Sequence, residues 1–286
     1  LADNGGGTLS HLPLFGSPLI ETGTNIVNGQ TIDQRGQARV GDSDYNGVAQ
    51  TDIGAVEYRG LTFSAASGSQ LGLTFTRVGD TIQISDAALG AIVLTAPVSE
   101  FDQFQLNGST SDDNVVVDLS GGNSLPVGGI NIVGAGDADS DSLMLTAGSV
   151  GTSAHVLTDV VDGSITVGGR AITYTSIETK RDWSVAVTKS FDFRNSTSNV
   201  VVSDTGTTTD GLLQISRSLG ATIEFAGPTS TLGITTQQGP DVITVAGLET
   251  NSVFGVALQT NDGADTIDVQ LVTGDSNIDS GFGADV

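Results

Sequence analysis

Residues 42–47, with the sequence Asp-Ser-Asp-Tyr-Asn-Gly, carry side-chain oxygens at alternate positions. Oxygen ligands at the first, third and fifth positions of such a loop can surround one hard cation, and glycine at the sixth permits the sharp turn. The twelfth position, which normally supplies a bidentate carboxylate, is Ile53, and an acidic residue stands just before it. The candidate calcium ligands are therefore Asp42, Asp44, Asn46 and Asp52, and the alternative is an acidic surface turn.

A second acidic cluster, at residues 137–141, reads Asp-Ala-Asp-Ser-Asp. It has the same alternation but lacks the glycine, and Gly148 stands where a terminal carboxylate is needed. Asp137, Asp139 and Asp141 are candidate calcium ligands, although a solvated turn is the simpler interpretation.

A third set of carboxylates belongs to a repeated phrase, in which a small-residue turn is followed by Asp and alternating aliphatic residues. Its clearest copies place Asp241, Asp265 and Asp285 at spacings of 24 and 20 residues, which suit one coil of a β-solenoid each. Strands on adjacent coils lie about 4.8 Å apart, so stacked carboxylates repel one another. We expect either exposed Asp side chains that hydrogen-bond their turns, or a calcium ion between them.

Residues suited to catalysis are few. The chain has no Cys, and its two histidines are His11 and His155. His11 lies in a Leu-rich segment, and His155 stands beside Val156 and Leu157 with no paired acid nearby, so both are expected to be structural. Residues 180–182, Lys-Arg-Asp, combine acid and base, but adjacent residues of a strand point to opposite faces, and a polar strand end is expected. The sequence predicts no catalytic and no cofactor-binding residues.

The composition favours short strands joined by tight turns. Gly contributes 39 of 286 residues, and the acidic residues comprise 27 Asp but only 6 Glu. Asp prefers turns, whereas Glu favours helices. A net charge of −23 argues against nucleic-acid binding. No apolar run approaches about 20 residues, so no membrane span is expected. The absence of Cys excludes disulfides and Cys-ligated zinc.

The elements that would position these residues divide the chain into three parts. Residues 1–59 contain four ordered motifs: LADNGGGTLSH from Leu1, GSPLIETG from Gly16, TIDQRG from Thr31 and DIGAVE from Asp52. This part resembles the carboxyl-terminal end of the bacterial choice-of-anchor Q family of secreted or surface proteins. The resemblance implies a right-handed parallel β-helix upstream, which residues 1–59 close. Gly7 stands where the family usually has Pro.

Residues 60–189 are expected to form an irregular β-solenoid or β-rich module, since alternating apolar runs and turn signals recur about every 8–12 residues. Residues 190–286 are expected to form β-solenoid repeats. The portion 218–286 resembles degenerate RTX-like repeats, and SGFGADV at its end looks like one calcium nonapeptide with Ser280 in place of its first Gly. True RTX arrays repeat every nine residues, and this chain does not. Tandem β-sandwich modules are the alternative architecture.

Function follows from repetition, acidity and the lack of a convergent site. We expect a non-catalytic extracellular structural or adhesin-like module of a large bacterial surface or secreted protein, stabilised by calcium, that contacts extracellular polysaccharide or a cell-surface ligand. The alternative is a fragment of a carbohydrate-active β-helix enzyme, a polysaccharide lyase or glycoside hydrolase. Both ends interrupt a pattern and the first residue is not Met, so a fragment of a longer protein is expected.

Overall fold

The computed structural model describes residues 7–13, 17–25, 29–41, 48–135, 140–194, 199–207, 209–218, 222–248, 252–270 and 274–286. These residues build an all-β protein with two large mixed sheets, which confirms the expected class. One short 3₁₀ turn, η1 (Val98–Glu100), is the only helical segment in this part of the chain. A helix long and apolar enough to cross a membrane is absent from the described residues.

The first sheet has ten strands, and its neighbours are parallel except within the unit β9–β10–β11. In spatial order the strands are β1 (Gly60–Ser64), β5 (Gln103–Asn107), β7 (Ile130–Val133), β11 (Arg170–Thr175), β10 (Gly163–Val167), β9 (Ser149–Leu157), β13 (Val185–Phe193), β17 (Thr231–Thr235), β19 (Gly255–Gln259) and β21 (Asn277–Asp279).

The second sheet has eleven strands, and its antiparallel pairs lie within β2–β3–β4 and β14–β15–β16. In spatial order the strands are β20 (Thr266–Val269), β18 (Val242–Val245), β14 (Asn199–Asp204), β15 (Leu212–Arg217), β16 (Thr222–Ala226), β12 (Thr179–Asp182), β8 (Ser142–Thr146), β6 (Asn114–Asp118), β2 (Gly72–Val78), β3 (Thr81–Asp86) and β4 (Ala91–Pro97).

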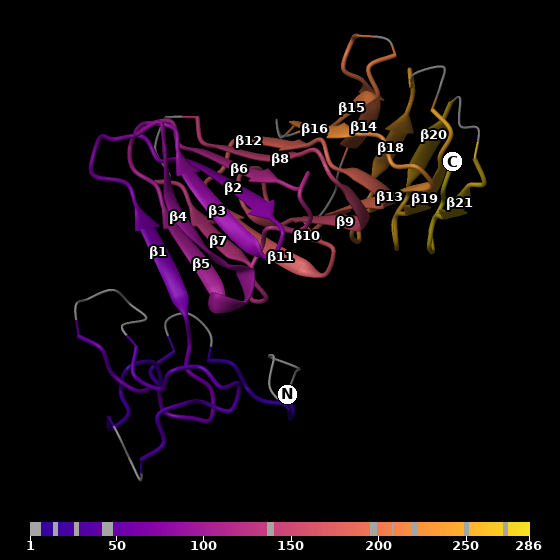
Figure 1. Ribbon diagram of the computed structural model, residues 1–286. Helices are drawn as coiled ribbons and strands as arrows, with labels where there is room; N and C mark the ends of the chain where they lie inside the picture. Colours follow the sequence, from indigo (N-terminus) through magenta and orange to yellow (C-terminus); the bar gives the residue numbers. More distant parts are fainter. Residues whose placement is uncertain are drawn as a thin grey trace.

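The chain passes back and forth between the two sheets, and each return places a new strand parallel to an earlier one. Three antiparallel meanders interrupt this alternation. The meander β9–β11 displaces the chain along the first sheet, so that β12 returns beside β8 and β13 beside β9. Figure 1 shows the sheets running from β1 to β20 and β21, with the amino-terminal segment, drawn in indigo, below them.

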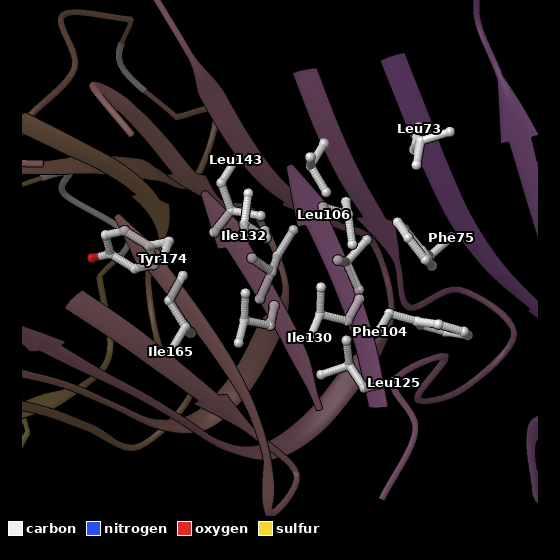
Figure 2. Close-up of a cluster of buried hydrophobic side chains, with 14 of the residues drawn as sticks. Leu73, Phe75, Phe104, Leu106, Leu125, Ile130, Ile132, Leu143, Ile165 and Tyr174 are labelled. Atoms are coloured by element: carbon white, nitrogen blue, oxygen red, sulfur yellow. The ribbon is translucent and has the colours of Figure 1, made fainter. Parts of the chain in front are cut away.

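Side chains alternate along each strand, and the inward set forms the core. In β6, Val115 and Val117 are buried while the residues between and beside them are partly exposed. Parallel register stacks such residues on their equivalents in neighbouring strands, as where Val115 pairs with Leu143 of β8. Figure 2 shows the resulting cluster, with Phe104, Ile130 and Ile165 on the first sheet and Leu73 and Phe75 on the second.

The core has two hydrophobic clusters, one built from residues between Leu71 and Ile177 and the other from residues between Leu157 and Leu258. Both sheets continue across the junction between them, because β13 pairs with β9 and β17 in the first sheet and β12 pairs with β8 and β16 in the second. The expected boundary between residues 189 and 190 falls inside β13. At this junction the aliphatic ladders are replaced by polar side chains, which are described below.

Candidate functional site

Four carboxylates stand immediately before strands of the second sheet, and all are buried: Asp113, Asp141, Asp241 and Asp265. Asp113, Asp141 and Asp265 each accept a hydrogen bond from the backbone amide of the residue that precedes the neighbouring parallel strand, and for Asp113 this donor is Leu71. The amide of Asp113 donates to Asp141 Oδ1 at 2.8 Å, and the amide of Asp241 donates to Asp265 Oδ1 at 2.8 Å. The amide of Asp265 continues the series by donating to Asp285 Oδ1 at 3.1 Å. We call this arrangement the aspartate ladder.

The expectation of exposure is wrong for Asp241 and Asp265 of the repeated phrase and for Asp141 of the second acidic cluster, none of which is more than 1% exposed. The physical reason is the alignment of parallel strands, which leaves a column of backbone N–H groups where the strands begin. A buried N–H without an acceptor is costly, and a carboxylate from the next strand is a strong acceptor. At β12 the same position is Glu178, whose Oε2 accepts the Asp141 amide at 2.9 Å.

The turn preceding each ladder residue has little room. A Cβ atom on Gly263 would lie 2.1 Å from the carbonyl oxygen of Gly239, two residues before Asp241 in the neighbouring copy of the turn. Stacked turns therefore approach each other through their backbones, and this close approach explains why the repeated phrase contains glycine at this point.

Of the other predicted calcium ligands, the structure describes only Asp52 among those at residues 42–52 and only Asp141 among those at residues 137–141. Asp42, Asp44, Asn46, Asp137 and Asp139 lie outside the described residues. Asp52 is buried, with Oδ1 accepting the Glu21 amide at 2.8 Å and Oδ2 accepting the Tyr58 amide. Within the described part of the chain, no group of three or more acidic, His or Cys side chains could hold a metal ion. Calcium binding at residues 42–47 stays a prediction.

The motif residues of the amino-terminal segment attach it to the sheets. Asp33 accepts hydrogen bonds from the backbone amides of Arg35, Gln37 and Glu57. The Arg35 guanidinium joins Asp33, at 3.0 Å, to Asp102, at 2.6 Å. Asp102 lies just before β5, so this ion pair connects the segment to the first sheet. Burial raises the pKa of Glu57 to about 7, and its Oε2 accepts the Asp52 amide.

A buried polar layer lies at the junction of the two hydrophobic clusters. At its centre Asp182 of β12 occupies the position next to Leu145 on one side and Phe225 on the other. Asp182 Oδ2 lies 2.9 Å from Nε2 of His155 and 3.1 Å from Nζ of Lys189. Ser153 Oγ donates to the same oxygen, and Ser184 Oγ donates to Oδ1. Residues of this layer are at most 1% exposed.

The charges of the polar layer are set by this packing. Burial alone would raise the pKa of Asp182, but the Lys189 ammonium and the hydrogen bonds from His155 and Ser184 hold it well below its usual range. Burial lowers the pKa of His155, so the imidazole is neutral and donates its Nε2 proton to the carboxylate. His155 also stacks on Phe191, with ring centroids 4.7 Å apart.

This layer is unsuited to catalysis. A Ser-His-Asp triad places the serine and the aspartate on opposite nitrogens of the imidazole. Here Ser153 and His155 Nε2 share one oxygen of Asp182, and substrate has no access to any of them. The expectation that His155 lacks an acidic partner is wrong, because Asp182 is 27 residues away in sequence but adjacent in the sheets. Asp182 stands at the end of β12, as expected of a polar strand end, but it is buried in the core, as is Lys180.

Both lysines of the chain, Lys180 and Lys189, are buried. Lys180 Nζ donates to the carbonyl oxygens of Val160, at 2.7 Å, and Ile177, at 2.6 Å, and lies 5.6 Å from the centre of the Tyr174 ring. Burial lowers the pKa of Lys180 to about 8, because desolvation disfavours the ammonium form.

Arginine side chains gather around a solvent-accessible cleft of about 450 Å³, which lies between the amino-terminal segment and strands of the two sheets. Arg77 of β2 and Arg170 of β11 line it together with Arg35 and Gln37 of the amino-terminal segment, and two carboxylates, Asp80 and Asp102, also belong to its lining. We call it the arginine cleft. Sequence reasoning missed it, since its basic residues are far apart in the chain and share no motif.

From the aspartate ladder we expect two substitutions in and next to β20 to change the free energy of unfolding by different amounts. Asp265→Ala removes the acceptor of the buried Asp241 amide and should lower the free energy of unfolding by about 1–3 kcal/mol. The control Asp268→Ala, at an exposed position of β20, should change it by about 0.5 kcal/mol or less. Urea unfolding measures both, and hydrogen exchange should accelerate at the Asp241 amide only in the first variant. Equal losses would contradict the ladder.

Because the pKa of Lys180 is lowered to about 8 in the folded protein, we expect the free energy of unfolding to rise between pH 8 and pH 10. In this window the folded protein has released the proton of Lys180, with pKa about 8, while the unfolded chain retains it, so the free energy of unfolding increases with pH. The slope contributed is at most about 1.4 kcal/mol per pH unit. Lys180→Met should flatten the profile measured by urea unfolding, and a slope unchanged by the substitution would refute the assignment.

No family model, curated protein or solved structure matches the chain. The resemblances of residues 1–59 and 218–286 therefore remain predictions. The aspartate ladder, the polar layer and the arginine cleft are the features from which a function must be inferred.

Proposed function

We propose that the chain is a non-catalytic extracellular module, structural or adhesin-like, of a large bacterial surface or secreted protein. The observation that carries this proposal is the stacking of parallel strands in both sheets from β1 to β21, with buried ladders along them. Such stacking gives length and stiffness, because every strand is stabilised mainly by its immediate neighbours. A spacer or stalk needs these properties.

The finer architecture belongs to the same proposal: a right-handed parallel β-helix or β-solenoid in which three antiparallel meanders are inserted. Its support is the repeated return of the chain to a parallel neighbour, as between β5 and β7 or β6 and β8. Tandem β-sandwich modules are the less favoured alternative, because antiparallel pairing dominates sandwiches and each module would have its own pair of sheets.

An extracellular location is favoured by the acidic surface and the absence of Cys. The chain has 33 acidic residues against 10 basic ones. A strongly charged surface keeps a long, repetitive molecule soluble and separate from its copies.

A carbohydrate-active enzyme, lyase or hydrolase, is the second candidate, and the arginine cleft favours it because it combines guanidinium groups with Asp80. We expect no oligosaccharide release when the purified chain is incubated with uronic-acid and neutral polysaccharides and the products are followed by reducing-end assay and absorbance of unsaturated sugars. Release that disappears in Asp80→Asn would replace the first proposal by the second.

Calcium stabilisation is proposed for residues 42–47, where Asp42, Asp44 and Asn46 offer three oxygen ligands. Asp52 is a weaker contributor, because both of its oxygens already accept backbone amides. A cation that binds only the folded state raises the unfolding temperature. The midpoint should therefore be higher in millimolar calcium than in chelator, and Asp42→Asn with Asp44→Asn should abolish the difference. Identical midpoints for the unsubstituted chain would remove calcium from the proposal.

A further inference from the structure

The arginine cleft concentrates positive charge on a molecule with a net charge of −23. Arg35, Arg77 and Arg170 are three of the ten basic residues in the chain, and all three line this one cleft. Like charges repel, so bringing three guanidinium groups together costs free energy unless anions balance them. Their convergence therefore requires an explanation.

The three guanidinium groups differ in their partners. Arg35 is neutralised by Asp33 and Asp102 and has a structural role. Arg77 faces a single carboxylate, Asp80, at 3.3 Å, and the side chain of Asp80 is fully exposed, so the ion pair is screened by water. Arg170 donates to the carbonyl oxygen of Leu125, and no carboxylate among the described residues forms an ion pair with it.

Arg77 and Arg170 also act on each other. Burial lowers the pKa of Arg170, and the positive charge of Arg77 lowers it further. Two cations that line one cleft repel each other, and that repulsion is relieved when an anion lies between them. The carboxylate of Asp102 does not serve this purpose, because its oxygens accept from Arg35 and from the Arg59 amide.

The two groups are held in place before any ligand arrives. Arg77 Nη1 donates to the carbonyl oxygen of Asn123 at 3.2 Å, and Asn123 Nδ2 donates to the carbonyl oxygen of Val167 at 2.8 Å. Asn123 thereby connects β2, which bears Arg77, to the turn before Arg170. A guanidinium has five N–H donors, so both side chains retain donors for a ligand, and their fork geometry matches a carboxylate.

The remaining lining suits a sugar ring. Gln37 and Ser99 provide hydrogen-bonding groups, and Val127, half exposed, provides an apolar surface beside them. Polar groups can pair with hydroxyls while apolar side chains pack against ring C–H groups, and a volume of about 450 Å³ lies in the range of small-molecule sites.

We propose that the arginine cleft binds a carboxylated saccharide, with Arg77 and Arg170 holding the carboxylate. The inference rests on the proposed non-catalytic function in one respect only, namely that the bound saccharide is retained and not cleaved. It adds to that function a ligand class and a place on the molecule.

Isothermal titration calorimetry tests the proposal with three probes: digalacturonate, its uncharged methyl ester and inorganic sulfate. Digalacturonate should bind, and binding should weaken as salt increases. Arg170→Gln and Arg77→Gln should each weaken it at least tenfold. The matched control is Arg194→Gln, which alters an exposed arginine paired with Asp192 on β13, away from the cleft, and it should bind as the unsubstituted chain does. Thermal midpoints of all variants verify folding.

The other outcomes overturn either the binding site or the non-catalytic function on which the inference rests. No binding of digalacturonate, equal binding of the methyl ester, or unchanged binding in both cleft variants would exclude the arginine pair as a carboxylate site. Binding of sulfate alone would exclude the saccharide class. Cleavage of bound digalacturonate would overturn the non-catalytic function while leaving the binding site in place, so the two failures are distinguishable.

Discussion

The structure depends on supplying an acceptor for every backbone N–H at the point where a parallel strand begins. Parallel register aligns the starts of the strands, so their backbone N–H groups form a column inside the protein, where water cannot serve as the acceptor. Asp113, Asp141, Asp265 and Asp285 provide acceptors, each from the neighbouring strand. The glycines of the turns follow from the same constraint, because the turns must approach closely enough for a short side chain to reach the adjacent backbone.

The polar layer around Asp182 makes a different contribution. Replacing buried ions by well-packed apolar residues often costs nothing or stabilises a protein, so this layer is poor evidence for added stability. Its value lies in register. His155 and Lys189 reach Asp182 only when β9, β12 and β13 are aligned as they are, and a slip by one residue would turn these groups outward and leave a buried charge unpaired.

The sequence was sufficient for the all-β class and for the inward alternation in repeats such as Val242–Val245. The sequence could not predict whether the repeated Asp residues are buried. Asp241 would suit an exposed turn or a buried one, and only the strand that lies beside it decides between them. The pairing of His155 with Asp182 and the meeting of Arg77 with Arg170 depend on which strands become neighbours. The positions of the meanders determine which strands become neighbours, and those positions follow from packing between segments that are distant in sequence.

The two internal meanders have a further consequence for how such a molecule can lengthen. One, β9–β11, widens the first sheet, and the other, β14–β16, widens the second by the same number of strands. Each sheet therefore continues to cover the other's apolar face. A meander inserted into only one sheet would make that sheet extend beyond its partner, and the apolar face of the extra strands would be exposed to solvent. Lengthening that keeps the apolar core covered therefore adds equal numbers of strands to the two sheets.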